Sequence, residues 1–166
     1  GIGGKWHVGD NYPFRPSEQG FDEALIHLAG GIGQVGDFTN YYKGNTSYFD
    51  PILWKNNKQN QYEGYCSDIF AENAIEFIEK NKNNSFFCYL SFNAPHTPLQ
   101  VPEKYYNMYK DLDPELGFKG ESLEQLKNPL NQLASMHRSR VHIRIGIVKL
   151  LIKNHQHKHL LLIDKF

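Results

Sequence analysis

The feature that most constrains the fold is an amphipathic stretch that leads directly into a buried one. Residues 67–81 carry an apolar stripe at helical spacing, formed by Phe70, Ala74, Phe77 and Ile78. After a short polar turn, residues 85–92 form a continuous apolar run, which is typical of a strand buried on both faces of a sheet. A helix followed by such a strand predicts an α/β sandwich in which helices flank a mixed sheet.

The segments before this helix carry weaker structural signals. Residues 5–8 lie between glycines and are predicted to be extended. Apolar residues at helical spacing predict a short helix over 17–29 that ends at a pair of glycines. Residues 30–64 have no sustained period, so we expect a long loop there, with a small hairpin around 48–54.

Length and composition limit the chain to ordinary globular classes. Its 166 residues are 40% hydrophobic and 22% charged, which fits one domain or part of one. No apolar run approaches the roughly 18 residues that a membrane span requires. The formal net charge of zero hides an asymmetry, because residues 1–136 hold 11 Lys and Arg against 17 Asp and Glu, whereas residues 137–166 hold 7 against 1.

Two residues near the start could act together on an anion. Lys5 and His7 are two positions apart, so in an extended segment both point to one side while Trp6 packs on the other. The glycines around them let the backbone approach a ligand closely. An ammonium beside an imidazole suits anion binding and proton transfer. The alternative is a surface lysine and a hydrogen-bonded histidine next to a core tryptophan.

A third candidate follows the predicted buried strand. His96 lies between Pro95 and Pro98, whose fixed φ angles would hold the imidazole with little entropy to lose on binding. In α/β sheets, ligands gather beyond the carboxyl ends of the strands, which is where this loop falls. The alternative is a histidine that caps a turn.

These segments together carry a resemblance to a known family. Gly4-Lys5-Trp6-His7-Val8-Gly9 resembles the GKWHxG segment of the sulfatases, and the segment from Asn93 to Pro98 resembles their second histidine loop, in the same order and at a similar separation. Shorter likenesses lie between and after them, at Arg15-Pro16, Gly20-Phe21-Asp22-Glu23, Gly64-Tyr65-Cys66-Ser67-Asp68 and Val101-Pro102-Glu103-Lys104-Tyr105.

The resemblance implies a fold like that of alkaline phosphatase and the hydrolysis of sulfate esters by a formylglycine nucleophile with calcium. By position, Lys5 would neutralise sulfate oxygens, His7 would orient the nucleophile and help to expel sulfate, and His96 would hold the sulfate or protonate the leaving oxygen. Lys5 and His96 would thus also bind the substrate, a sulfated small molecule or carbohydrate. No nucleic-acid or membrane partner is implied, and the family suggests an exported protein, whether secreted, periplasmic or lysosomal.

The sequence also departs from the family pattern. Neither Cys66 nor Cys88 stands in the Cys-x-Pro-x-Arg segment from which the family makes formylglycine, so we expect the nucleophile to lie outside this chain, together with the calcium ligands. No metal ligand is therefore assigned here. We expect residues 1–136 to form a partial catalytic domain whose sheet is incomplete at both ends. An inactive remnant, or a phosphodiesterase or phosphonate hydrolase of the same superfamily, is the alternative.

Residues 137–166 differ from the rest in charge, histidine content and aromatic content. A change of reading frame just after Met136 would account for all three differences, and we treat this segment as an aberrant basic tail. Taken at face value, it could instead bind nucleic acid or acidic membrane through its basic residues, which include Arg138, Arg140, Arg144, Lys149 and Lys153. A metal site at His155, His157 and His159 is a further reading.

Overall fold

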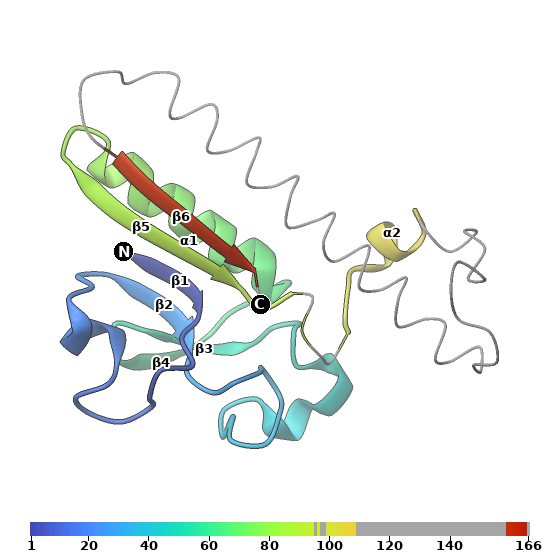
Figure 1. The fold of residues 1–166 in the computed structure, drawn as a ribbon. Coiled ribbons are helices and arrows are strands. Elements are labelled where there is room, and N and C mark those ends of the chain that lie inside the picture. The colour runs from blue at the N-terminus through green and yellow to red at the C-terminus, as the bar shows by residue number, and fades with distance from the viewer. Residues whose placement is uncertain (95, 97–98, 109–158, 166) are drawn as a thin grey trace.

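The computed structural model describes residues 1–94, 96, 99–108 and 159–165 (Figure 1). It contains a six-stranded sheet with the strand order β4-β3-β2-β1-β5-β6. The strands are β1 (Ile2–Lys5), β2 (Ala24–His27), β3 (Ile52–Lys55), β4 (Lys58–Gln61), β5 (Phe86–Phe92) and β6 (His159–Lys165). The helices are α1 (Cys66–Asn81) and the single turn α2 (Glu103–Tyr106), with 3₁₀ turns at Pro16–Gln19 and Tyr41–Thr46.

The sheet is mixed, as predicted. Strand β1 pairs in parallel with both β2 and β5, and β6 pairs in parallel with β5. Strands β3 and β4 form an antiparallel hairpin that continues the sheet from β2. Because β2, β1 and β5 all run in one direction, the segments that follow them emerge at the same edge of the sheet, which is where α/β proteins place their ligands.

Strand β1 approaches its neighbours so closely that glycine is required. Gly4 has a φ of 115°, and a Cβ atom at this position would lie 1.8 Å from the carbonyl oxygen of Ser91 on β5. No L side chain tolerates both the positive φ and this contact. The glycines before Lys5 therefore set the tight packing of the central strand.

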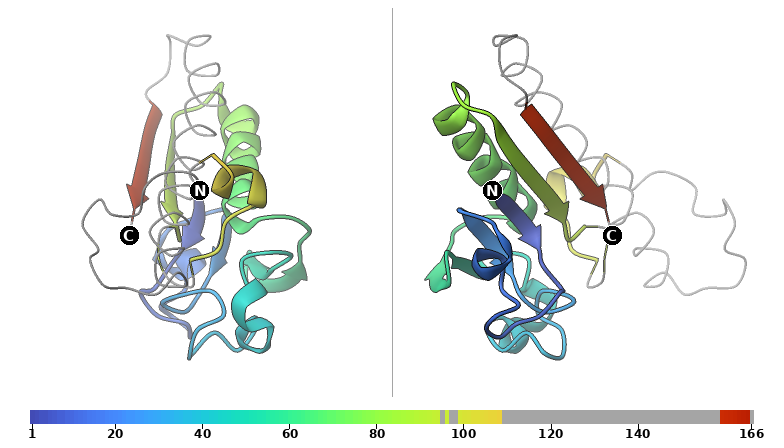
Figure 2. Two further views of the ribbon diagram at one scale, coloured as in Figure 1. Left: turned by 90° about the vertical axis from the view of Figure 1, so that its right-hand side faces the viewer. Right: turned by 60° about the vertical axis from the view of Figure 1, so that its left-hand side comes forward.

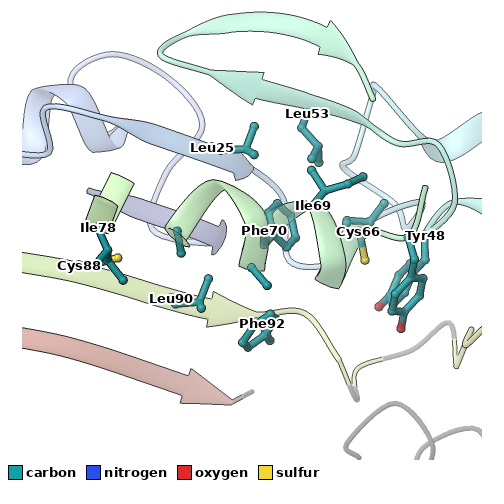
Figure 3. Close-up of a cluster of buried hydrophobic side chains, with 14 residues drawn as sticks. Leu25, Tyr48, Leu53, Cys66, Ile69, Phe70, Ile78, Cys88, Leu90 and Phe92 are labelled. Atoms are coloured by element: carbon teal, nitrogen blue, oxygen red, sulfur yellow. The ribbon is translucent and has the colours of Figure 1, made fainter. Parts of the chain in front are cut away.

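Helix α1 covers one face of the sheet, as Figures 1 and 2 show from three directions. Its apolar stripe packs on β5 and β2, and Phe70, Leu90 and Phe92 are fully buried. Figure 3 shows this cluster extending from Ile78 and Cys88 at one end of the helix to Cys66 and Tyr48 at the other. Burying each large apolar side chain contributes about 1.5–3 kcal/mol, so the contact between α1 and β5 is a main source of stability. The predicted helix and buried strand are both confirmed.

A second, smaller apolar cluster involves Ile2, Ala24 and Ile26, which alternate in sequence with residues of the first cluster. Trp6 packs against this second cluster and meets Phe21 edge to face, with ring centroids 6.0 Å apart. Since β1 and β2 have apolar contacts on both faces, their sequences show no alternation between polar and apolar residues.

The predicted helix over 17–29 is wrong. The 3₁₀ turn Pro16–Gln19 ends at Gly20, whose φ is 92°, and the chain then enters strand β2. The apolar run of β2 is continuous because the strand is buried, and in so short a segment it matches helical spacing as well as strand spacing. The predicted extended segment at 5–8 also lies too late, because β1 ends at Lys5 and His7 has a φ of 53°.

The predicted hairpin exists but lies later in the sequence than 48–54. Strands β3 and β4 are joined by Asn56 and Asn57, with φ values of 46° and 67°. Positive φ at both central residues is the geometry of a tight two-residue hairpin turn, and asparagine adopts it more readily than most residues. Before the hairpin, residues 30–51 form the predicted irregular loop, apart from the turn Tyr41–Thr46.

The end of the chain contributes strand β6, which was not predicted. Residues 137–158 lie outside the described part of the chain, and so do the basic residues and two of the three histidines named above for this tail. In the described ranges, neither helix reaches the length and apolar character that crossing a membrane demands.

Candidate active site

Lys5 ends the central strand and is the first of the three candidate residues. Its side chain is only 4% exposed, and its main-chain carbonyl oxygen accepts a 2.6 Å hydrogen bond from Oγ of Ser91. Burial lowers the pKa of the Lys5 ammonium, because a desolvated charge is less favourable. A cation held in this way has lost part of its water shell, and an anion can replace that shell.

His7 follows after a sharp change of backbone direction. Its main-chain N–H donates a 3.2 Å hydrogen bond to the carbonyl oxygen of Leu28, and its side chain is exposed. The imidazole lies against Gly30, where a Cβ atom would come within 2.8 Å of Nε2 of His7. Gly30, which was predicted to end a helix, instead makes room for His7.

Trp6 anchors the turn between Lys5 and His7. Its indole N–H donates to the carbonyl oxygens of Phe14, at 2.7 Å, and Gly9, at 3.1 Å. These bonds tie the loop that follows His7 back to the sheet. As predicted, Trp6 packs in an apolar layer. The positive φ of His7, however, means that the two candidates do not share one side of a regular strand.

His96 lies beyond the carboxyl end of β5 and is held mainly through its backbone. Its N–H donates to the carbonyl oxygen of Asn93 at 2.8 Å, and its own carbonyl oxygen accepts a 2.9 Å hydrogen bond from the phenol of Tyr48. Nδ1 of the ring lies 3.4 Å from Nε2 of Gln34. Pro95 and Pro98, which were predicted to hold this loop, lie outside the described residues.

A buried polar network supports the His96 loop. The amide of Asn93 donates to the phenol oxygen of Tyr48, and the main-chain N–H of Tyr48 donates to Oε1 of Gln100 at 2.8 Å. Tyr48 is 1% exposed, and burial raises the pKa of its phenol, which stays protonated and able to donate. Neither Tyr48 nor Gln100 was predicted, because each lies in an irregular stretch with no periodic signal.

His27 is a further titratable group beside Lys5. The two residues are paired across β1 and β2, and His27 is 1% exposed. Its pKa is lowered to about 4, mainly by burial and also by the positive charge of Lys5, while the carboxylate of Asp37 partly opposes this shift. Neither ring nitrogen has a hydrogen-bond partner within the described residues. His27 is therefore a neutral imidazole at neutral pH, and the incorrect helix prediction hid it from the sequence analysis.

The three predicted residues thus meet at one edge of the sheet. Lys5 and His7 follow the end of β1, and His96 follows the end of the neighbouring β5. The loop after β2 touches both sides, because Leu28 bonds to His7 and Gln34 to His96. A desolvated ammonium and two more exposed imidazoles at one edge of a sheet are groups that can bind an anion and exchange protons with it.

Calcium does not fit the residues present. Across the described ranges, no group of three or more His, Cys, Asp or Glu side chains is placed to hold a metal ion. A hard divalent cation takes about six oxygen ligands, so Asp37, whose carboxylate already accepts several hydrogen bonds within its own loop, would not bind one alone.

The two cysteines are buried in the core. Cys66, the first residue of α1, and Cys88 on β5 are both free and buried in the core between the helix and the sheet. Burial raises the pKa of the Cys66 thiol to about 12 and that of Cys88 to about 11. Both therefore remain protonated at neutral pH and lack the thiolate that a nucleophile needs.

Comparisons with known proteins agree with the geometry. A protein-family model described as "Sulfatase" matches residues 2–141. An uncharacterised sulfatase of Schizosaccharomyces pombe is 34% identical over 119 residues, covering 66% of this chain and 21% of that protein. An arylsulfatase of Klebsiella aerogenes is 27% identical over 112 residues, covering 66% of this chain and 24% of its own length. The chain thus spans less than a quarter of either curated relative.

One solved structure is also similar. The crystal structure of Ps i-CgsB in complex with k-i-k-neocarrahexaose superimposes with a TM-score of 0.70 and 25% sequence identity. The match covers 99% of this chain and 36% of that protein.

Proposed function

The chain belongs to the sulfatase family of the alkaline phosphatase superfamily, and on this basis we propose that Lys5, His7 and His96 form part of a site that hydrolyses sulfate esters. The observation that carries this proposal is the burial of Lys5 at the carboxyl end of the central strand, next to the two histidine-bearing segments. A preorganised cation in a site that excludes water stabilises developing negative charge far more than a hydrated one does.

Each residue has a role that follows from its surroundings. Lys5 would neutralise the sulfate oxygens, since its charge is partly desolvated. His7 is exposed, so its ring can orient the attacking hydroxyl and help to expel sulfate. His96 would hold the sulfate or donate a proton to the oxygen of the departing alcohol, with its ring positioned by Gln34.

The nucleophile is proposed to be a formylglycine that lies outside this chain. Such a group would supply a hydroxyl that attacks sulfur. Cys66 and Cys88 are excluded as its source, because neither is followed by Pro and Arg at the required spacing. Calcium is likewise proposed for the longer protein, with ligands that lie elsewhere, and no part of the mechanism above depends on it.

The substrate is proposed to be a sulfated carbohydrate or small molecule. The support is that Ps i-CgsB, which shares this fold at 25% identity, binds an oligosaccharide. By family resemblance we also propose that the protein is exported. Nothing in the described site separates a sulfate ester from a phosphate ester, so the superfamily's phosphoesterases define the competing outcome of the test.

The proposal can be tested by binding, independently of turnover. Isothermal titration of the chain with 4-nitrophenyl sulfate should show a saturable site, and Lys5→Ala should weaken it about tenfold or more, since it removes a charge-assisted contact. Lys58→Ala on the exposed strand β4 is the matched control and should leave the affinity unchanged. If wild type and Lys5→Ala bound 4-nitrophenyl sulfate with equal affinity, Lys5 would not belong to the binding site and the proposal would be wrong.

Two further outcomes separate the alternatives. If 4-nitrophenyl phosphate binds at least ten times more tightly than the sulfate, the site is suited to phosphate esters, and the proposed hydrolysis of sulfate esters is wrong. If neither ester binds, the chain is an inactive remnant. Sulfate release by the chain alone would contradict the proposal that the nucleophile lies elsewhere.

A further inference from the structure

A pocket of about 210 Å³ lies beside the candidate site and is not used by the proposed chemistry. It is bounded by the loop after His7, the segment after β2, the loop around residue 37 and the β3–β4 hairpin. The residues that matter for its chemistry are Asp10, Arg15, Asp37, Phe38 and Trp54.

Arg15 is held in a fixed orientation at this pocket. Its Nε donates a 2.7 Å hydrogen bond to the main-chain carbonyl oxygen of Asp10, and its guanidinium carbon lies 4.5 Å from the centre of the Trp54 ring. Both contacts leave the terminal N–H groups unused, and within the described residues these groups have no hydrogen-bond or ion-pair partner. A planar guanidinium stacked on an aromatic ring keeps its donor edge available for an oxyanion.

The carboxylate of Asp37, which could pair with Arg15, already accepts hydrogen bonds from its own loop. Asp37 also lines the pocket, but its oxygens accept hydrogen bonds from Gly33 N at 2.8 Å, Thr39 Oγ1 at 2.6 Å and Asn40 Nδ2 at 3.1 Å. Those bonds hold Asp37 within its own loop. Asp10 lines the pocket as well, and Arg15 forms a salt bridge with neither carboxylate in the described part of the chain.

An aromatic side chain stands at the same pocket. Phe38 lines it and is 95% exposed, a large apolar surface left in water. A flat, exposed ring at the rim of a pocket suits the apolar face of a sugar. A fixed guanidinium beside an exposed aromatic ring suits a ligand that consists of a sugar ring with a negatively charged substituent.

The pocket adjoins the candidate site through a continuous segment. Leu28 and Ala29 line the pocket, while Leu28 accepts the N–H bond of His7 and Gly30 underlies its imidazole. A ligand in the pocket would therefore lie on the same segment that contacts His7.

We propose that this pocket binds a sugar ring bearing an oxyanion, a carboxylate or second sulfate, on a substrate whose scissile sulfate ester is held by Lys5, His7 and His96. This inference rests on the proposed function for the scissile group only. The pocket itself should bind an anionic sugar that has no sulfate ester at all, which allows the two ideas to be tested apart.

The test uses the two tryptophan indole N–H signals of the ¹⁵N-labelled chain. Trp54 lines the pocket, whereas the Trp6 indole is bonded internally to Phe14 and serves as a control for folding. Titration with methyl β-glucuronide should shift the Trp54 signal saturably and leave that of Trp6 in place, and neutral methyl β-glucoside should shift neither.

Variants assign the binding to Arg15. Arg15→Gln should weaken glucuronide binding about tenfold, because a charge-assisted bidentate contact is lost. Arg15→Lys should weaken it also, since lysine keeps the charge but not the fork. Lys5→Gln should leave it unchanged. A glucuronide shift of Trp54 that persists in Arg15→Gln would contradict the proposed role of Arg15, and this result would leave the sulfate-ester test at Lys5 unaffected.

A second titration shows whether the pocket accepts a sulfate or only a carboxylate. Methyl galactoside 6-sulfate is titrated into Lys5→Gln, in which the first site is disabled. A saturable shift of Trp54 that Arg15→Gln removes would show that the pocket accepts sulfate, whereas a shift with glucuronide alone assigns it to a carboxylate. If neither sugar shifts the Trp54 signal, the proposal fails.

Discussion

The phenol of Tyr48 donates a 2.9 Å hydrogen bond to the main-chain carbonyl oxygen of His96, although the two residues are 48 positions apart in the sequence. The same phenol oxygen accepts a hydrogen bond from the amide of Asn93. A single buried hydroxyl therefore holds the histidine loop at both of its ends. The placement of His96 thus depends on the irregular segment before α1 as much as on strand β5.

Replacing this hydroxyl should loosen the loop. In Tyr48→Phe, the Asn93 amide and the His96 carbonyl both lose a buried partner, so we expect the free energy of unfolding to fall by about 1–3 kcal/mol. Urea denaturation measures the change, and the His96 ring signal in NMR should broaden. The matched control is Tyr62→Phe, whose hydroxyl is half-buried and should contribute less than about 0.5 kcal/mol. Equal effects in the two variants would contradict the assigned role of Tyr48.

Alanine substitution at two glycines with positive φ can separate the stability lost to a steric clash from the stability lost to backbone strain. Gly4→Ala would place a Cβ atom 1.8 Å from the carbonyl oxygen of Ser91, whereas Gly20→Ala meets no atom within 4 Å. We expect Gly20→Ala to cost about 1–2 kcal/mol from backbone strain alone and Gly4→Ala to cost several kcal/mol more, or to prevent folding. Guanidinium denaturation compares the pair. Similar midpoints would mean that β1 and β5 are less closely packed than described.

His27 should make stability depend on pH. Its pKa is about 4 in the folded protein against 6.5 for the ordinary group, so the unfolded chain binds the extra proton between these values. Stability is then fully present above pH 6.5 and is lost as the pH falls toward 4, by up to about 3 kcal/mol from this group. His27→Leu removes the titration and should flatten the curve over that interval. If the stability of wild type and of His27→Leu changed with pH in the same way, His27 would not be the group responsible.

The cysteines should be inert until the protein unfolds. Both thiols have raised pKa values, about 12 for Cys66 and about 11 for Cys88, and both are buried. A thiol-specific disulfide reagent at pH 7.5 should therefore titrate neither group in the native chain and both in guanidinium. Rapid reaction of either thiol in the native chain would show that the core beneath α1 opens readily.

The elements that the sequence predicted best are those with a long, one-sided pattern. Helix α1 has four turns of apolar periodicity, and β5 has an uninterrupted apolar run, so pattern alone identifies both. Lys5, His7 and His96 were chosen as candidates from their types and from the glycines and strand ends beside them, and their roles remain predictions. Their arrangement at one sheet edge follows from the parallel direction of β1 and β5.

The remainder depended on contacts that leave no local signal. The apolar residues of β2 match helical spacing by coincidence, and only pairing with β1 makes the segment a strand. His27 could not be found before that pairing was known. Tyr48, Gln34 and Gln100 act through hydrogen bonds to residues far away in the sequence, which no periodicity reveals.

The position of β1 has a consequence for the order in which the molecule assembles. The strand occupies the middle of the sheet, yet one of its two neighbours, β5, lies 86 residues later, as the bond from Ser91 to Lys5 shows. At synthesis rates of about 5–20 residues per second, β1 would wait on the order of 4–17 s for that neighbour to emerge. During this time one edge of the nascent β1–β2 pair is open to the wrong strand, so slow, chaperone-dependent folding is expected of this chain.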